Sequence, residues 1–236
     1  MRTPNSSPNR RSFFTTAGSI AAVGSVAYFP WTERAFANQA KNDRPLIGGI
    51  GLGGMGSGDC RGHAGFGDIV AVADVDRGHA ERAKHDDRIG KGIADVYVDY
   101  RELLDRTDID VISIATPDHW HVKIAVEALM SGKHVFCQKP LTLTLEENQL
   151  IRSACKSHPD QVFFIGTQQR SSRDKVLRAV NMVQKGLLGG INKITVGING
   201  GSRGGPFKKS DPPENLDWDA WLGQAPMLDY IRERCL

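Results

Sequence analysis

Short apolar runs alternate with polar, helix-forming stretches through the middle of this 236-residue chain. Runs rich in β-branched and aromatic residues predict buried strands at residues 45–50, 68–73, 96–98, 110–115, 134–137 and 162–165. Between them, Asp99 and Glu102 have capping-box form before one helix, Thr144 and Glu147 cap another, and Gly132 marks the end of a third over residues 122–130. Six strands alternating with helices predict a parallel sheet covered on both faces, which is a doubly wound α/β fold.

The first 37 residues differ from the rest and have the three-part layout of an export signal. Residues 1–11 are polar and basic, residues 12–29 are moderately apolar, and Ala35 and Ala37 occupy the positions that a signal peptidase reads. The pair Arg10-Arg11 resembles a twin-arginine signal, so we expect export through the twin-arginine translocase, cleavage after Ala37 and a periplasmic protein. The N-terminal residue of the mature protein would test this expectation. The alternative is an uncleaved membrane anchor, although a stable span needs roughly 20 strongly apolar residues.

Composition and charge narrow the range of partners. The 30 basic and 27 acidic residues give a net charge of +3, and the surplus lies in the first 37 residues, where four arginines accompany one glutamate. The remainder is electrically balanced, so we expect no nucleic-acid partner. The four cysteines are widely and irregularly spaced, without a CxxC pair, and therefore do not predict a disulfide framework.

A glycine-rich turn follows the first predicted strand and indicates a dinucleotide site. It reads Gly51-Leu52-Gly53-Gly54-Met55-Gly56, the pattern GxGxxG. Gly51 permits a tight turn, Gly53 lets a diphosphate approach the backbone, and Gly56 lets the next helix pack closely. The diphosphate then meets free amides at the helix N-terminus, where the helix dipole favours anions. Gly54 and Met55 lie in the same turn and belong to the predicted site.

Asp74 ends the second predicted strand and is the candidate ribose-binding carboxylate. It lies 18 residues after Gly56, close to the spacing expected for that role. A carboxylate there accepts hydrogen bonds from the 2′- and 3′-hydroxyls and repels a 2′-phosphate, so we expect NAD rather than NADP. The alternative is that Asp74 caps the polar helix that begins near Asp76. Strand, glycines and acid together predict an NAD-binding Rossmann domain over residues 44–170, after a linker at residues 38–43.

Chemistry-bearing residues also follow the later strands, beyond whose carboxyl ends such sheets bind their ligands. The segments are Thr116-Pro117-Asp118-His119-Trp120-His121, Gln138-Lys139-Pro140 and Gly166-Thr167-Gln168-Gln169-Arg170. His119 and His121 have a spacing that metal ligands use, but no cysteine or acid cluster completes a ligand set, so we expect no metal. Arg170 fits a contact with substrate oxygens and an ion pair equally well.

With these motifs the chain resembles the glucose–fructose oxidoreductase, inositol dehydrogenase and rhizopine-catabolism family (Gfo/Idh/MocA). The matching features are the GxGxxG turn, Asp74, the Thr-Pro-x-x-x-His segment, the Lys-Pro pair and a Trp-rich stretch at residues 217–223. The resemblance implies that Thr116, Pro117 and His121 lie around the cofactor near its nicotinamide. It also implies that Lys139 faces nicotinamide and substrate, and that Gln138, where the family usually has Glu, helps to hold the ribose.

Lys139 is the predicted catalytic residue. Oxidation of a sugar alcohol removes a hydride from carbon and a proton from oxygen, and an amine beside a cationic nicotinamide favours its neutral form because like charges repel. Such an amine can hydrogen-bond the reacting hydroxyl and help to move its proton. The alternative is a surface lysine before a turn proline. Gln138 keeps the size of Glu without its charge, which we expect to weaken any orientation of Lys139 or of the ribose.

Residues 171–236 resemble only the beginning of the family's second domain. The pattern predicts a helix over residues 174–185 and one strand over residues 193–198, followed by a Gly/Pro-rich connection and the Trp-rich stretch. A stable sheet usually needs three or more strands, so we expect an incomplete α+β open-sheet substrate domain in a C-terminally truncated chain. In the family that domain usually makes the dimer contact, which leaves a homo-oligomer an open expectation.

The resemblance implies an NAD-dependent oxidoreductase that transfers hydride to or from a sugar or polyol. Two alternatives stay open at this point. One is an NAD-dependent glycosidase of the same family, which oxidises its sugar transiently and then regenerates the cofactor. The other is an NAD-binding fragment without catalytic activity.

Overall fold

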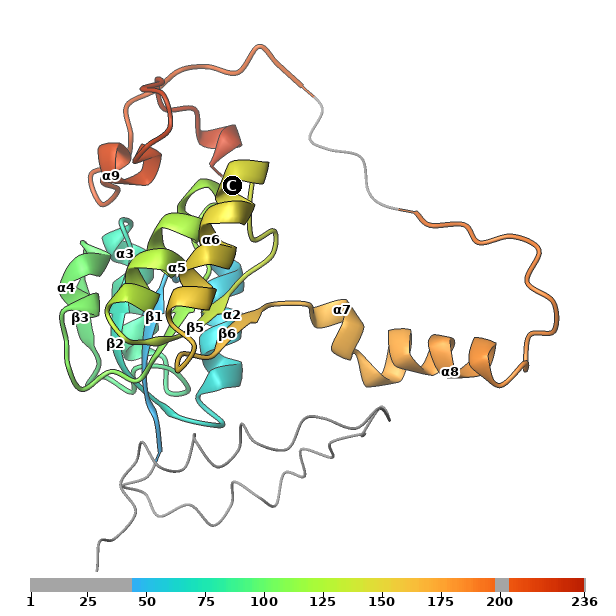
Figure 1. The fold of residues 1–236 in the computed structure, drawn as a ribbon. Helices are drawn as coiled ribbons and strands as arrows, with labels where there is room; N and C mark the ends of the chain where they lie inside the picture. Colours follow the sequence, from blue (N-terminus) through green and yellow to red (C-terminus); the bar gives the residue numbers. More distant parts are fainter. Residues whose placement is uncertain (1–43, 198–203, 236) are drawn as a thin grey trace, which may run out of the picture. The chain divides into compact units, whose positions relative to one another are not determined.

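The computed structural model describes residues 44–197 and 204–235, so the expected export signal and linker lie outside the described residues. The centre of the chain is a six-stranded, all-parallel sheet in the order β3-β2-β1-β4-β5-β6, with helices on both faces (Figure 1). This is the strand order of the dinucleotide-binding doubly wound fold, and the predicted fold class is confirmed. No described helix combines the length and the apolar character that a membrane span requires.

The six strands predicted for the parallel sheet are present, with ends that differ by at most one residue. The strands are β1 (Leu46–Ile50), β2 (Asp68–Ala73), β3 (Asp95–Tyr97), β4 (Val111–Ile114), β5 (His134–Cys137) and β6 (Phe163–Ile165). The helices around them are α2 (Gly54–His63), α3 (Arg77–His85), α4 (Tyr100–Leu104), α5 (His121–Met130) and α6 (Leu145–Ser157), with the 3₁₀ turn η2 (Asp118–Trp120) before α5. Thr144 and Glu147 cap α6 as predicted, through a reciprocal capping box, whereas Asp99 caps α4 by accepting from the backbone nitrogen of Arg101.

Two hydrophobic cores, one on each face of the sheet, hold the helices in place. One face packs α4, α5 and α6 through fully buried residues such as Leu103, Ile124 and Leu129. The other face packs α2 and α3 through smaller residues such as Cys60 and Ala80. Burial of each large aliphatic side chain contributes about 1.5–3 kcal/mol, which explains why the central strands are apolar on both faces. Burial also raises the pKa of the Cys60 thiol to about 12, so Cys60 is a packing residue.

The carboxyl ends of five strands, β2, β1, β4, β5 and β6, stop at the same level of the sheet. Ile50 of β1 pairs with Ala73 of β2 and with Ile114 of β4, and the register continues through Cys137 of β5 to Ile165 of β6. The residues that follow these strands are therefore brought to one edge, although they are far apart in sequence.

After β6 the described chain is helical and then irregular. It forms α7 (Gln168–Ser171), a π-helical turn (Arg173–Leu177) that continues into α8 (Arg178–Gln184), and later α9 (Trp218–Leu222) and the 3₁₀ turn η4 (Arg232–Arg234). The helix predicted over residues 174–185 is therefore present, in two segments.

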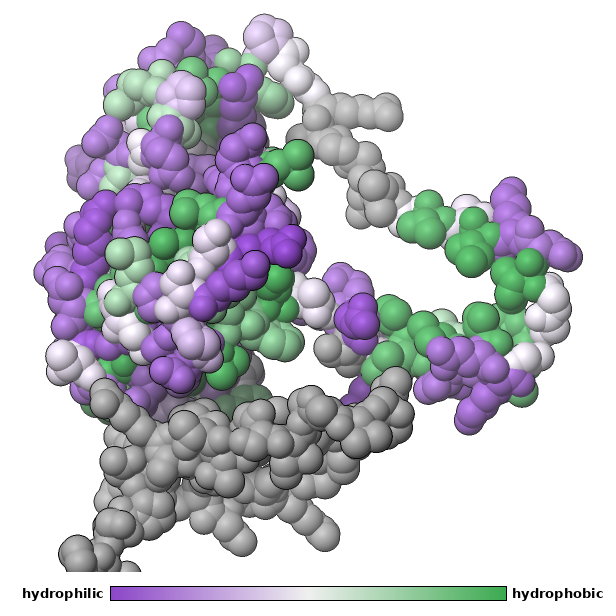
Figure 2. Space-filling view, in the orientation of Figure 1, coloured by the Kyte–Doolittle hydropathy of each residue, from purple (hydrophilic) through white to green (hydrophobic). Residues whose placement is uncertain are grey.

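The strand predicted over residues 193–198 is wrong across its described part, because residues 193–197 form no regular structure. An isolated extended segment has no neighbour to complete its backbone hydrogen bonds. The side chains of Ile194 and Val196 are 79% and 82% exposed, and Figure 2 shows hydrophobic residues at the surface of this part of the chain. The described residues after β6 thus contain no strand of a second sheet, and the expected open-sheet domain is not seen in them.

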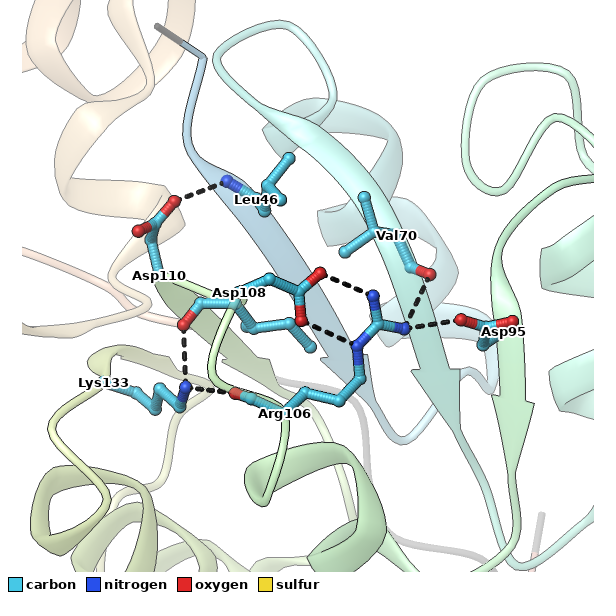
Figure 3. Close-up of polar contacts among 8 residues, drawn as sticks. Leu46, Val70, Asp95, Arg106, Asp108, Asp110 and Lys133 are labelled. Carbon is cyan, nitrogen blue, oxygen red and sulfur yellow. Dashed lines mark hydrogen bonds and ion pairs between the residues drawn. The ribbon is translucent and has the colours of Figure 1, made fainter. Parts of the chain in front are cut away.

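A polar network ties the loops at the amino ends of the strands (Figure 3). The Arg106 guanidinium donates Nε and Nη2 to both carboxylate oxygens of Asp108, at 3.0 and 2.7 Å, and Nη1 to Asp95, at 2.6 Å. Lys133, 6% exposed, donates to the carbonyl oxygens of Arg106 and Ile109. Arg106 lowers the pKa of Asp108, and burial lowers the pKa of Lys133. These contacts hold the strand starts and lie at the edge opposite the predicted site.

Replacement Arg106→Met should lower the free energy of unfolding by about 1–2 kcal/mol, because both half-exposed carboxylates lose a charged partner but keep water. Urea unfolding measures this, with Arg152→Met on the exposed side of α6 as the matched control, expected within about 0.5 kcal/mol of the parent. The pKa of Asp108 is lowered in the folded state, so its contribution is present above the unfolded-state pKa and is lost as the pH falls through the lower, folded-state value. The difference between parent and Arg106→Met should accordingly shrink below about pH 4. An equal loss of unfolding free energy in Arg106→Met and Arg152→Met would contradict this account.

Candidate cofactor-binding site

The glycine-rich turn brings the start of α2 directly against β1 and β4. Gly51 has φ +80°, and a Cβ atom there would lie 2.7 Å from the backbone nitrogen of Thr116. A Cβ atom at Gly56 would lie only 1.7 Å from the carbonyl oxygen of Gly51. Only glycine fits at these two positions, so the close approach expected from the GxGxxG pattern is a feature of the backbone itself.

The N-terminus of α2 faces open space and carries no competing acid. Gly53 is its N-cap and makes no side-chain capping hydrogen bond, and the first turn has no acidic residue. A Cβ atom at Gly53 would meet only His79 Cε1, at 3.9 Å, and one at Gly54 would meet nothing within 4 Å. The uncapped amides and the positive end of the helix dipole are therefore accessible to an anion of the size of a diphosphate.

Asp74 holds the glycine-rich turn beside the end of β2. Its Oδ2 accepts a hydrogen bond from the backbone nitrogen of Leu52 at 2.6 Å, and its Oδ1 accepts one from the backbone nitrogen of Asp76 at 2.8 Å. The cap of α3 is Asp76, whose side chain accepts from Gly78 and His79, so the alternative role considered for Asp74 is filled by another residue. Oδ1 of Asp74 keeps a second lone pair, which a ribose hydroxyl can use.

His79, in the first turn of α3, lies beside Asp74. Its Nδ1 is 3.5 Å from Asp74 Oδ2, and the hydrogen bond to Asp74 raises the pKa of His79. The imidazole also borders the open space in front of Gly53. His79 thus adds a partial positive charge to the region between the glycine-rich turn and the candidate ribose site.

A cavity of about 830 Å³ joins these groups, within the size range of natural ligand pockets. Of the predicted cofactor residues it is lined by Gly51, Gly53, Gly54, Met55, Asp74, Thr116 and Pro117. The Thr116 hydroxyl is buried and has no hydrogen-bond partner among the described residues, an arrangement that costs free energy unless a ligand completes it. The open helix start, the carboxylate and this hydroxyl together fit a dinucleotide.

The cavity is also lined by residues for which the sequence predicted no role at the cofactor, among them His79, Tyr100, Trp120, Trp221 and Gln224. His79 and Trp120 follow the ends of β2 and β4 closely, so their positions in the sequence could have predicted that they lie at the cavity. Trp221 and Gln224 come from a segment about one hundred residues downstream of β4, and no local pattern indicates where that segment lies.

Four predicted residues do not line the cavity. Gly56 packs beneath the turn, and His121, 1% exposed, bridges two loops, its ring nitrogens lying 2.6 Å from the carbonyl oxygen of Pro140 and 2.9 Å from that of Thr116. Lys139 is exposed, and the peptide bond between Lys139 and Pro140 is cis. The described residues contain no group of three or more His, Cys, Asp or Glu side chains that could hold a metal ion.

Gln138 is a buried link rather than a cavity residue. It is 3% exposed, its Nε2 donates to Asp59 Oδ2 of α2 at 2.7 Å, and its Oε1 accepts from the backbone nitrogen of Lys139 at 2.9 Å. The loop that carries Lys139 is therefore tied to the helix that begins at the glycine-rich turn. The amide is needed for this link, since a glutamate would place a second carboxylate against Asp59.

Replacement Gln138→Glu should destabilise the chain by about 1–3 kcal/mol at pH 8, because two carboxylates would meet where one hydrogen bond now lies. The loss should be smaller near pH 5, where the pair can share a proton. The double variant Asp59→Asn with Gln138→Glu restores a donor opposite an acceptor and should recover most of the stability. Thermal unfolding of the parent and the two variants at both pH values measures this. A Gln138→Glu variant as stable as the parent at pH 8 would show that the link is unimportant.

Comparison with known proteins places this geometry in a family. Residues 46–166, about half of the chain, match the model of an oxidoreductase family with an NAD-binding Rossmann fold. Among curated proteins, an alpha-N-acetylgalactosaminidase from Shewanella oneidensis is 30% identical over 203 residues, which cover 77% of this chain and 44% of that protein. This chain therefore spans less than half the length of such relatives.

Solved structures of similar fold include inositol dehydrogenases. The myo-inositol 2-dehydrogenase of Lactobacillus plantarum superposes with a TM-score of 0.55 and 30% identity, over 62% of this chain and 42% of that chain. The scyllo-inositol dehydrogenase of Lactobacillus casei, with bound NAD(H) and scyllo-inositol, gives a TM-score of 0.54 and 26% identity over similar shares, 62% and 42%. On its family match, its strand order and its glycine-rich turn, this chain belongs to the Gfo/Idh/MocA family of NAD-binding oxidoreductases.

Proposed function

We propose that this chain binds NAD across the carboxyl ends of its strands, as part of an enzyme that moves hydride between the cofactor and a hydroxyl-bearing carbon of a sugar or polyol. The observation that carries the proposal is that the uncapped start of α2, Asp74 and Thr116 line one cavity. When bound, NAD supplies the hydride acceptor or donor.

Different residues along the cavity would bind different parts of the dinucleotide. The amides at the start of α2 would hold the diphosphate, because they are uncapped and lie at the positive end of the helix dipole. Asp74 would accept the hydroxyls of the adenosine ribose. Thr116 and Pro117, which follow β4, would then lie toward the nicotinamide.

The charges around the adenosine end favour NAD over NADP. Besides Asp74, the carboxylates of Asp76, Asp99 and Asp217 line the cavity. Arg101, which also lines it, already donates to both oxygens of Asp99, at 3.1 and 3.0 Å. A 2′-phosphate would enter a mainly negative environment, which raises its free energy there.

Lys139 is our candidate for proton transfer. It follows β5 at the same sheet edge as the cavity, in a loop fixed by Gln138 on one side and by the contact between Pro140 and His121 on the other. The residue is exposed, so its amine is accessible to a substrate hydroxyl. The rigid loop would limit where that amine can reach, which is what positioning of an acid–base group requires.

A second candidate is the glycosidase reaction, in which the same cofactor oxidises a sugar transiently. The observation that favours it is the similarity to a curated protein named alpha-N-acetylgalactosaminidase, over 77% of this chain. Both candidates need the same NAD site, and they differ in whether reduced cofactor accumulates.

Calorimetric titration with NAD tests the site directly. The unchanged chain should bind NAD, and Asp74→Ala should weaken binding by about tenfold or more, because hydrogen bonds to a charged group contribute about 1.5–3 kcal/mol. Asp87→Ala removes an equivalent charge from an exposed loop and should leave the affinity within about twofold. NADP should bind more weakly than NAD to the unchanged chain. Equal affinities of the parent and Asp74→Ala for NAD would refute the assignment of Asp74.

Two parallel assays on the complete gene product separate the candidate reactions. A dehydrogenase should show a rise in nicotinamide absorbance when NAD is mixed with a panel of inositols and aldoses. A glycosidase should release nitrophenol from nitrophenyl N-acetylgalactosaminide with no net reduced cofactor. Lys139→Met should lower the dehydrogenase rate by about 10²-fold or more, as expected for loss of a general acid–base group. A full rate in that variant would remove Lys139 from the chemistry.

A further inference from the structure

The Trp-rich end of the chain forms the second wall of the candidate cofactor cavity. Residues 213–235, called the strap below, lie beyond residues 46–166, which match the family model. Strap residues that line the cavity include Asp217, Trp221 and Gly223. The cavity is thus enclosed between the glycine-rich edge of the sheet and a segment that the sequence places far from it.

One anchor of the strap lies beside Asp74. The backbone nitrogen of Asp217 donates to the carbonyl oxygen of Val75, and that of Arg77 donates to the carbonyl oxygen of Asn215, both at 2.9 Å. The Asn215 side chain donates to Asp76 Oδ1 at 2.6 Å. These bonds fix the strap next to the candidate ribose carboxylate.

The other anchor lies on the loop that follows β4. The carbonyl oxygen of Trp221 accepts from Trp120 Nε1 at 3.0 Å and lies 2.9 Å from His119 Nε2. Gly223 has φ +54°, and a Cβ atom there would lie 2.1 Å from the Trp120 ring. The backbone of the strap can approach Trp120 this closely only because the residue is glycine.

The strap is also packed within itself. The rings of Trp218 and Trp221 stack at 4.8 Å, Tyr230 meets Trp218 edge-on at 5.2 Å, and Trp218 Nε1 donates to the carbonyl oxygen of Leu228 at 2.8 Å. Leu222 is 4% exposed. Such aromatic contacts make the segment a unit, so we expect it to move as a whole.

We infer that the strap is a binding element for the dinucleotide and controls its exchange. Its two anchors lie beside the two ends of the proposed cofactor, at Asp76 and at Trp120, so opening of either anchor would widen the path by which a dinucleotide leaves the cavity. This inference rests on the proposed function. Asn215, Trp221 and Gly223 thereby help to hold the cofactor as well as packing the strap. The rate at which the cofactor is released then depends on both anchors and on the contacts of the Rossmann domain.

Release of NADH from the full chain tests the inference. The complex is mixed with a large excess of NAD, and loss of nicotinamide fluorescence gives the release rate. Gly223→Ala forces the strap away from Trp120 and should speed release by about tenfold or more, and Asn215→Ala, which removes one side-chain anchor, by about threefold to tenfold. The matched control is Gly92→Ala, which has a similar positive φ of +78° with no atom near the added Cβ, and which should release NADH within about twofold of the parent rate.

The outcomes separate this inference from the proposed function. If the unchanged chain does not bind NADH at all, the proposed function is overturned and the inference falls with it. If parent and variants bind NADH but Gly223→Ala and Asn215→Ala release it at the parent rate, the inference alone is overturned. Should Gly223→Ala fail to fold, Asn215→Ala still decides, since it loses a surface hydrogen bond without any steric clash.

Discussion

The site depends on the close backbone contact between Gly51 and Gly56. Because neither residue has a Cβ, α2 starts immediately after β1, and its uncapped amides face the carboxyl edge of the sheet. The same turn delivers the backbone nitrogen of Leu52 to Asp74 at 2.6 Å, which links the diphosphate and ribose parts of the proposed site. A side chain at either glycine would move the helix start and separate groups that act on one ligand.

Polar groups have hydrogen-bond partners at the amino edge of the sheet and lack some of them at the carboxyl edge. At the amino edge, Arg106 and Lys133 find partners for their donors, so the charges stabilise the loops. At the carboxyl edge, the helix start is uncapped and the Thr116 hydroxyl has no partner among the described residues. Unmet hydrogen-bonding capacity is costly in a folded protein, and the open helix start borders a cavity in which a ligand can supply the missing partners.

Gln138, where the family usually has Glu, can be understood only together with its neighbours. As a replacement for glutamate, it predicts weaker orientation of Lys139 or of the ribose. In the structure its amide is matched to Asp59, and it joins the Lys139 loop to α2. The strap is a second example. Trp221 and Gly223 are understood only from their contacts with Trp120, which lies a hundred residues earlier in the sequence.

Local pattern was sufficient for the strands, the capping box at Thr144, the glycine-rich turn and the position of Asp74, since each depends on residues that are neighbours in sequence. It was misleading at residues 193–197, where alternating apolar residues have no strand beside them to complete a ladder. Tertiary structure alone decided that His121 and Gln138 brace loops, that Asp76 rather than Asp74 caps α3, and that residues 213–235 close the cavity. These outcomes depend on contacts across the sheet edge, and sequence spacing carries no information about which distant groups meet there.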